Sequence, residues 1–245
     1  MKFSVITVSY QDGPSLAKTL ESLTQFDKSI YEHIVIDGGS HDGTLKIIKK
    51  YNSRIDTWIS EPDRGIYHAM NKGLKIITNN NIVSFLNAGD LAKNNYFQEP
   101  LNIFLHNKSI DYCYGGITLV GRIKESKYIP KIFNTNSEYL QRMPFPHPAL
   151  FVKKHVFLKI GDFNVNKKIT ADHEWVVRLI KSNFHGSRLE SSLVNFQLGG
   201  SSLKFSAQVE IFQTAISNKR NIFLASFLFI YQVLVYLYYT IKSKS

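Results

Sequence analysis

The first ninety residues alternate between short apolar runs and amphipathic stretches. The apolar, β-branched runs have the composition of buried strands and lie at residues 2–10, 33–36, 57–60 and 82–86. Between them, apolar residues recur at spacings of three and four, which predicts helices that each cover a sheet with one face. The third helix presents Ile66, Met70, Leu74 and Ile77 in this way. Such alternation predicts a nucleotide-binding α/β half with a parallel sheet.

After residue 90 the pattern is less regular. It predicts a helix at residues 95–106 and a loop that holds three prolines around His147 and runs into a strand. A further helix is predicted at residues 171–180. The runs at residues 111–115, 117–123 and 128–133 predict strands, the last two as an antiparallel excursion.

The C-terminal stretch, residues 222–241, carries no charged residue. A helix of that length is about 30 Å long, which is the thickness of a hydrocarbon core. Lys219 and Arg220 precede it, and Lys242 and Lys244 follow it. We expect this helix to contact a membrane, either by spanning it or by lying in its plane; a buried core helix or an oligomer interface is the alternative.

Composition narrows the classes of partner. The chain has 245 residues, of which 44% are hydrophobic and 20% charged, as in a folded protein. The single cysteine, Cys113, excludes an internal disulfide framework and a cysteine-rich metal site, and it fits a reducing cytoplasm. The net charge of +11 suits nucleic acid, an anionic membrane or a phosphate-bearing substrate. No nucleic-acid-binding motif is present, so we expect no nucleic acid partner, and the cations beside the apolar tail favour membrane phosphates.

Asp90 is the first candidate for chemistry. It ends the small-residue turn that follows the fourth predicted strand. In open α/β sheets, ligands bind outside the carboxyl ends of the strands, so this carboxylate is placed to hold a cation or a sugar hydroxyl. The chain has no G-x-G-x-x-G after its first strand and no G-x-x-x-x-G-K-[ST] motif. Gly38, Gly39 and Gly43 follow the second strand and are either part of a site or simple turn glycines.

Seven segments in a fixed order resemble a known family. They read ITVSY, VIDGGSHDGT, SEPDRGIYHAMNKG, FLNAGD, PHPALFVKK, ADHEWVVRL and FQLGGSS. Over residues 3–202 this set is similar to the glycosyltransferase family 2 enzymes of bacterial polysaccharide assembly, in the colanic-acid-type branch. The resemblance implies an α/β GT-A fold with a mostly parallel central sheet flanked by helices, and the apolar run at residues 222–241 adds a C-terminal helix to it.

The resemblance also implies a division of the chain and a chemistry. A single GT-A domain would comprise residues 1–205, with a nucleotide-binding half at 1–90 and an acceptor-side half at 91–205. Residues 206–245 would form a basic, apolar helical tail that associates with membrane. The donor would be a UDP- or GDP-sugar, the cofactor Mg²⁺ or Mn²⁺, and transfer would invert the anomeric carbon.

Carried over by position, the family motifs assign roles to individual residues. Asp90 would bind the metal, with Gly89 in place of a second carboxylate. Asp172 would be the general base and Glu174 the alternative, although both also suit the first turn of a helix as favourable anions. His68 stands where the family usually has an aspartate, and it either alters sugar choice or caps its helix. The nucleotide-sugar site would comprise Ser9, Tyr10, Asp37, Asp63, Asn71 and Lys72. The acceptor and diphosphate side would comprise His147, Gly199, Gly200 and Ser201.

The expected function is that of a metal-dependent inverting hexosyltransferase. It would act on a polyprenyl-linked or oligosaccharide acceptor in the synthesis of capsule, O-antigen or exopolysaccharide, at the cytoplasmic face of the bacterial inner membrane. A non-catalytic membrane or polysaccharide-binding module of the same fold is one alternative. A nucleotidyltransferase is another, but the first turn reads YQDGPS and lacks the glycine- and lysine-rich triphosphate motif that such enzymes usually carry.

Overall fold

The computed structural model describes the chain except residues 78–80, 122–124, 132–137, 141, 198–204 and 243–245, and beyond residue 234 it describes only the backbone of the last helix. The strands are β1 (Phe3–Ser9), β2 (Tyr31–Asp37), β3 (Thr57–Ser60), β4 (Ile82–Phe85), β5 (Leu91–Ala92), β6 (Tyr112–Val120), β7 (Ser126–Tyr128), β8 (Leu150–Lys153) and β9 (Gly186–Gln197). The helices are α1 (Gly13–Leu23), α2 (Thr44–Lys50), α3 (Ile66–Ile76), α4 (Gln98–His106), α5 (Lys154–Ile160), α6 (Ala171–Lys181), α7 (Phe205–Ser217) and α8 (Ile222–Lys242).

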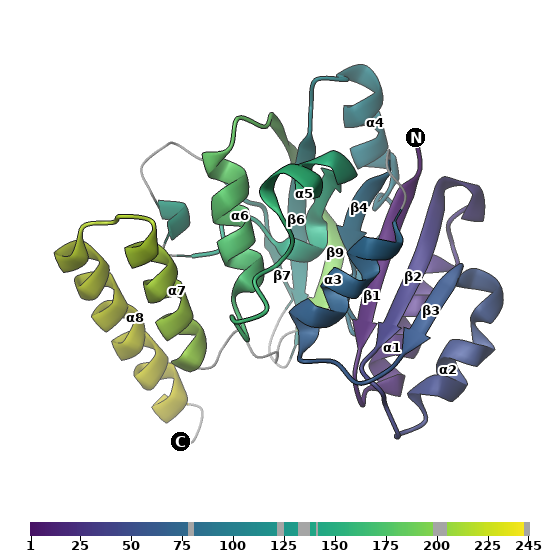
Figure 1. Ribbon diagram of the computed structural model, residues 1–245, viewed down its shortest axis with the longest axis horizontal. Coiled ribbons are helices and arrows are strands. Elements are labelled where there is room, and N and C mark those ends of the chain that lie inside the picture. The colour runs from purple at the N-terminus through teal and green to yellow at the C-terminus, as the bar shows by residue number, and fades with distance from the viewer. Residues whose placement is uncertain (78–80, 122–124, 132–137, 141, 198–204, 243–245) are drawn as a thin grey trace.

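One sheet runs through the molecule in the order β3-β2-β1-β4-β8-β6-β9-β5, with β7 paired to β6 (Figure 1). The first four strands are parallel, as the alternating pattern predicts. β8 is antiparallel to both β4 and β6, while β9 is parallel to β6. The α/β class is therefore confirmed, and the second half of the sheet is mixed rather than parallel.

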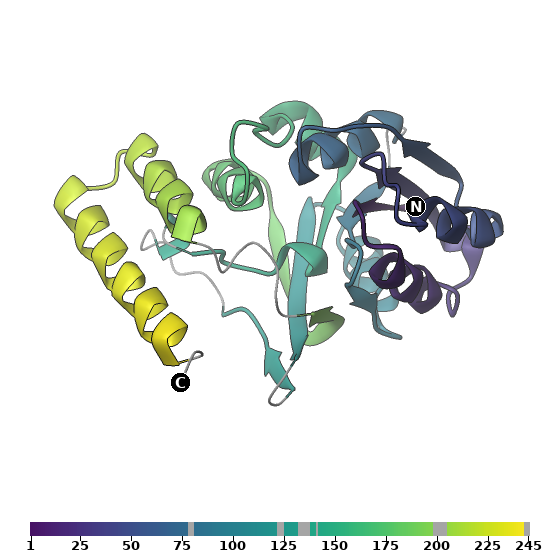
Figure 2. The ribbon, with the colours of Figure 1, turned by 90° about the horizontal axis from the view of Figure 1, so that it is seen from below.

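Helices cover both faces of the sheet (Figures 1 and 2). α3, α5 and α6 share one hydrophobic cluster with the strands on one face. Clusters on the other face contain the buried side chains of α1, α2 and α4. The hairpin of α7 and α8 lies at one end of the molecule, beside α6, and α8 is the outermost helix (Figure 2).

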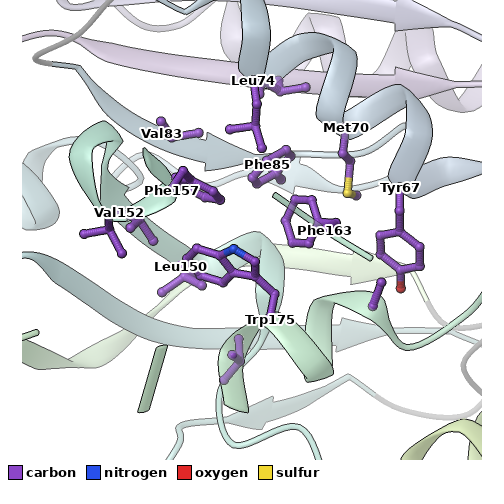
Figure 3. Close-up of a cluster of buried hydrophobic side chains, with 14 of the residues drawn as sticks. Tyr67, Met70, Leu74, Val83, Phe85, Leu150, Val152, Phe157, Phe163 and Trp175 are labelled. Atoms are coloured by element: carbon purple, nitrogen blue, oxygen red, sulfur yellow. The ribbon is translucent and has the colours of Figure 1, made fainter. Parts of the chain in front are cut away.

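The buried face of α3 differs from the prediction by one position. Ile66 is 40% exposed, whereas Tyr67 is 5% exposed and joins Met70 and Leu74 in the core. Figure 3 shows Leu74 next to Phe85, and Met70 and the Tyr67 ring next to Phe163. Tyr67, Met70 and Leu74 are spaced by three and four residues and so share the buried face of α3. Tyr67 at the start of this face reaches α6, where its hydroxyl group contacts Asp172.

The second half of the sheet shows where the pattern misleads. The strands predicted at 111–115 and 117–123 form the single strand β6, whose register against β9 shifts at Gly116. Two adjacent glycines interrupt the apolar run there and mimic a break. The antiparallel excursion is confirmed, because β7 pairs antiparallel with β6, but its second strand lies earlier than predicted: β7 covers Ser126–Tyr128 and is exposed, and residues 132–133 lie outside the described part. No pattern predicted β9 or α5.

The predicted C-terminal helix is present as α8 and packs on α7. Within the described residues, no helix combines the length and the apolarity needed to cross a membrane. Leu140, Val177, Ala215 and Ala225 form a small core between this hairpin and the rest of the chain. The division into residues 1–205 and 206–245 stays a prediction.

Candidate active site

The ends of three parallel strands meet at one edge of the sheet. Ser9 of β1 lies opposite Asp37 of β2, and Asp37 lies opposite Ser60 of β3. The neighbouring strand β4 ends at Phe85 and leads into the turn that ends at Asp90. The fold thus gathers the strand-end candidates at the carboxyl edge, where ligands bind in sheets of this type.

Asp37 holds this edge together. Its Oδ1 accepts a hydrogen bond from Ser40 Oγ (2.5 Å), and its Oδ2 accepts from Ser60 Oγ (2.6 Å). The main-chain N–H groups of Gly39 (3.2 Å) and Ser40 (2.9 Å) also donate to Oδ2. The side chain is fully buried. Both oxygens are thus bonded, to the loop after β2 and to Ser60 of β3, and the expected role of Asp37 as an acceptor for ribose or uracil stays a prediction.

Tyr10 and Asp63 form the exposed part of this edge. The Tyr10 residue is 63% exposed. A Cβ atom built on Gly38 would lie 2.8 Å from Asp63 Oδ2 and 3.0 Å from Tyr10 Cδ2, so the carboxylate and the ring both lie close to the backbone of this glycine. Asp63 Oδ1 accepts from Gly65 N (2.7 Å). An aromatic face beside a carboxylate suits a nucleoside, which offers a flat base and ribose hydroxyl groups. Ser9 Oγ, also predicted here, is buried without a partner among the described residues.

Lys72 and His68 stabilise the turn before α3. Lys72 Nζ pairs with Glu61 (2.8 Å) and donates to the carbonyl oxygen of Pro62 (3.2 Å). His68 Nδ1 accepts from Arg64 N (3.1 Å), a bond within the turn, and α3 begins without a side-chain cap bond, so the expected helix-capping role is not observed. Desolvation, with the nearby cations Lys72 and Arg64, lowers the pKa of His68 and favours the neutral ring that accepts this bond. A role for Lys72 beside phosphate stays a prediction.

Asn71 has a structural partner. Its Nδ2 donates to the carbonyl oxygen of Phe163 (2.8 Å), and its Oδ1 accepts from the N–H of the same residue (3.0 Å). Asn71 is also buried. Both ends of this amide thus join α3 to the segment before α6, and the expected role of Asn71 near the ribose or diphosphate stays a prediction.

Asp90 is a buried carboxylate that no described side chain neutralises. It is 5% exposed, and burial raises its pKa to about 7, opposed by the main chain of Asn87. An isolated buried carboxylate is costly, and a bound cation would remove that cost. No group of three or more His, Cys, Asp or Glu side chains in the described part of the chain is arranged to hold a metal. Mg²⁺ is commonly bound by one or two carboxylates together with substrate phosphates, so Asp90 fits a cation that shares its ligands with a diphosphate.

Asp172 lies at the start of α6 with one oxygen held and the other available. Oδ1 accepts from the Tyr67 hydroxyl (2.9 Å) and from the N–H of His173 (2.8 Å). Within the described structure, Oδ2 has no hydrogen-bond partner. Burial and the Asp172 charge raise the pKa of Tyr67, which keeps its hydroxyl group protonated as a donor. A carboxylate oriented through one oxygen and open at the other is suited to accept a proton.

Glu174 is engaged elsewhere. Arg178 binds it in a bidentate pair, from Nε to Oε1 (2.9 Å) and from a terminal nitrogen to Oε2 (3.1 Å). The same guanidinium donates to the main-chain oxygens of residues 160–162. Both oxygens of Glu174 therefore belong to a structural network, and the geometry favours Asp172 as the base.

His147 packs against the end of β4. Its buried ring stacks on Phe85, with centroids 4.9 Å apart, and meets Phe163 edge-on at 5.5 Å. Burial lowers the pKa of His147, and the charge of Asp172 partly opposes this change. The other residues expected on this side, Gly199, Gly200 and Ser201, lie outside the described part of the chain.

Two residues that support the site escaped prediction. Tyr67 orients Asp172 and is the only tyrosine in the motif SEPDRGIYHAMNKG. Its place in this motif could have marked it as a functional candidate. Thr19 of α1 accepts from Gly89 N (2.9 Å) and donates to the carbonyl oxygen of Asn87 (3.2 Å). Thr19 thereby holds the turn that carries Asp90, in which Gly89 has a positive φ of 99°. A threonine within a helix gives no sign of such a role.

Comparison with known proteins places these features in a family. A family model described as glycosyl transferase family 2 matches residues 4–171. An uncharacterized glycosyltransferase of Mycobacterium tuberculosis (strain ATCC 25618 / H37Rv) is 31% identical over 179 residues, which cover 71% of this chain and 67% of that protein.

Solved structures share the fold. S. aureus TarS 1-349 in complex with UDP-GlcNAc gives a TM-score of 0.67 at 18% identity, over 94% of this chain and 70% of that chain. The mannosyltransferase PcManGT from Pyrobaculum calidifontis, in complex with GDP-Man and Mn²⁺, gives a TM-score of 0.66 at 14% identity, over 92% and 68%. These similarities confirm the GT-A type of α/β fold.

Proposed function

The chain belongs to glycosyl transferase family 2, and we propose that it is a metal-dependent inverting hexosyltransferase that uses a nucleotide-diphosphate sugar as donor. The observation that carries this proposal is the geometry of Asp172, whose Oδ1 is held by Tyr67 while Oδ2 has no partner among the described residues. An enzyme that removes a proton from an acceptor hydroxyl needs a carboxylate of this kind, with one oxygen held in place and the other open to the substrate.

The nucleotide of the donor would occupy the carboxyl edge of the parallel strands. The base would pack against Tyr10, and Asp63 Oδ2 would accept a hydrogen bond from the ribose. Solved structures of similar fold contain UDP-GlcNAc in one case and GDP-Man with Mn²⁺ in another, which supports a UDP- or GDP-sugar as donor. The diphosphate would then extend toward Asp90.

Asp90 would hold a divalent cation, Mg²⁺ or Mn²⁺, against the diphosphate. When bound, that ion would supply positive charge to the leaving group. The contribution of the protein is a buried carboxylate with no competing partner in the described structure, on a turn anchored by Thr19. The carboxylate is thus positioned before the donor arrives.

The chemical step follows from the orientation of Asp172. Its Oδ2 would accept the proton of the acceptor hydroxyl as that oxygen forms a bond to the anomeric carbon. The bond from this carbon to the diphosphate oxygen breaks at the same time, and the nucleoside diphosphate leaves. Attack from the face opposite the leaving group gives an inverted product. Tyr67 keeps Oδ1 fixed while Oδ2 takes the proton.

The acceptor is proposed from the surface of α8. Large apolar side chains on its described part are exposed, led by Phe223 (83%), Phe227 (66%), Tyr231 (60%) and Leu234 (60%). These positions recur at spacings of four, four and three and form one stripe, with Lys219 exposed just before the helix. An apolar stripe beside cations suits the surface of an anionic membrane. We infer a polyprenyl-linked or oligosaccharide acceptor, surface-polysaccharide synthesis, and a site at the cytoplasmic face of the bacterial inner membrane.

Removing part of this stripe should weaken binding to membranes. The double variant Phe223→Ala/Phe227→Ala is expected to bind vesicles of phosphatidylglycerol and phosphatidylethanolamine roughly tenfold or more weakly, because each phenylalanine loses apolar contact area. Co-sedimentation of the full chain measures this. Leu105→Ala/Leu158→Ala, on α4 and α5, is the matched control, since these leucines are 56% and 63% exposed. If both double variants bound the vesicles equally well, the proposal that α8 contacts the membrane would be contradicted.

A nucleotide screen tests the donor class. UDP, GDP, CMP and TDP are added to the protein with and without Mn²⁺, and Tm is followed. A ligand that binds only the native state raises the apparent stability by mass action. We expect a Mn²⁺-dependent increase in Tm with one of the nucleoside diphosphates. No shift with any nucleotide would favour a non-catalytic module of the same fold.

A further inference from the structure

A glutamate in the C-terminal hairpin binds the loop that precedes the base. Glu210 of α7 accepts hydrogen bonds from three successive main-chain N–H groups: Lys168 to Oε1 (2.8 Å), and Ile169 (3.1 Å) and Thr170 (2.8 Å) to Oε2. The Thr170 hydroxyl adds a fourth bond to Oε2 (3.0 Å). Lys167 Nζ donates to the main-chain oxygen of Glu210 (2.9 Å). One residue of α7 thus holds four consecutive residues of a distant loop.

This loop leads directly into the site. Thr170 is the residue before the first turn of α6, and Asp172 follows two positions later. The Tyr67 hydroxyl, which donates to Asp172, also contacts the carbonyl oxygen of Ile169. The position of Ile169 therefore affects both Asp172 and the phenol that orients it.

The charge state of Glu210 suits this role. Burial raises its pKa, but the main-chain donors and the Thr170 hydroxyl outweigh burial, so the net pKa is lowered and the side chain is ionised near neutral pH. Hydrogen bonds to an ionised acceptor are stronger than those between neutral groups. A carboxylate that binds N–H groups just before a helix also interacts favourably with the helix dipole.

We propose that Glu210 is a positioning residue for Asp172, and that the α7–α8 hairpin sets the geometry of the base through it. The inference rests on the proposed function, because Asp172 must act as a base for its position to affect turnover. It goes further by assigning the hairpin, which bears the exposed apolar stripe, a direct structural link to the reacting centre.

Glu210→Ala tests the link in the full-length chain. Turnover, measured as nucleoside diphosphate released from a nucleotide sugar, is expected to fall about 10- to 100-fold, because small displacements of a reacting group have effects of this size. The KM for donor should stay within about twofold, because Glu210 is remote from Tyr10 and Asp63 in the hydrogen-bond network. Glu210→Gln, which retains one acceptor oxygen, should recover much of the turnover. Gln213→Ala, at an exposed position of the same helix, is the control and should retain wild-type activity.

A double-mutant cycle separates positioning from general destabilisation. In an Asp172→Asn background, Glu210→Ala should reduce the residual turnover by less than about twofold, since the base that it positions is already absent. An equal loss in both backgrounds would overturn the inference, as would wild-type turnover by Glu210→Ala in an active enzyme.

Hydrogen exchange makes the two proposals fail separately. In Glu210→Ala, the amides of residues 168–170 should exchange at least about tenfold faster than in Gln213→Ala, because they lose their acceptor. Unchanged exchange overturns the positioning role whether or not the wild type is active. If the wild type releases no nucleoside diphosphate from any donor, the proposed function fails, whereas faster exchange in Glu210→Ala would still show that Glu210 holds the loop before Asp172.

Discussion

Asp172→Asn is expected to lower the turnover by about 10²- to 10⁴-fold while the donor still binds, because general bases contribute in this range. Asparagine retains an oxygen that can accept from Tyr67 and the N–H of His173, so the fold around α6 should persist. What it loses is the ability to take a proton. Steady-state release of nucleoside diphosphate gives the turnover, and a nucleotide titration gives the binding.

Glu174→Gln is the matched comparison, since it makes the same chemical change two residues away on the same helix. It should lower stability more than turnover, because its partner Arg178 joins α6 to residues 160–162. Normal turnover by Asp172→Asn together with a large loss in Glu174→Gln would transfer the role of base to Glu174.

Asp90→Asn is expected to abolish the Mn²⁺ dependence of nucleotide binding. The substitution preserves the size of the side chain and removes the charge that would bind the ion. Isothermal titration of the nucleoside diphosphate, with Mn²⁺ and with EDTA, should give different affinities for the wild type and equal ones for the variant. If Mn²⁺ raised the nucleotide affinity of Asp90→Asn as much as that of the wild type, Asp90 would not be the metal ligand.

The same variant should be more stable than the wild type when no metal is bound. The pKa of Asp90 is raised from 3.8 to about 7 in the folded protein, so the native state binds more protons than the unfolded state between these values. The stability of the wild type therefore falls relative to Asp90→Asn as the pH rises from about 4 to 7, by on the order of a few kcal/mol, and the difference is constant above that range. If Tm in EDTA changed with pH in the same way for the wild type and Asp90→Asn, the raised pKa of Asp90 would be contradicted.

The strand pattern of the sequence located the carboxyl edge of the sheet. Apolar runs defined the four parallel strands, and because parallel strands end at one edge, that pattern assigned Asp90 to it. Ser9, Asp37 and Asp63 were assigned by the family motifs rather than by the pattern. Such predictions succeed where a single period dominates a segment and where the turn residues are distinctive.

Other features depend on contacts that no local pattern encodes. Asn71 is a polar residue within a motif, yet its partner is the main chain of Phe163, and Asp37 binds the hydroxyl of Ser60 on a separate strand; only the tertiary structure brings these groups near. Glu210 is a helical glutamate like any other until α7 packs beside the loop before α6. β9 escaped prediction because its 12 residues mix buried and exposed positions without strict alternation. Long-range packing, not propensity, decides these positions.

The measurement that tests the central claim most directly is nucleoside diphosphate release from UDP- and GDP-sugars, with Mn²⁺, by the wild type and Asp172→Asn side by side. The proposed mechanism predicts release from at least one donor by the wild type and a loss of about 10²-fold or more in the variant. Equal release by the two proteins would contradict the role of Asp172, and no release from any donor would contradict the proposed transferase activity.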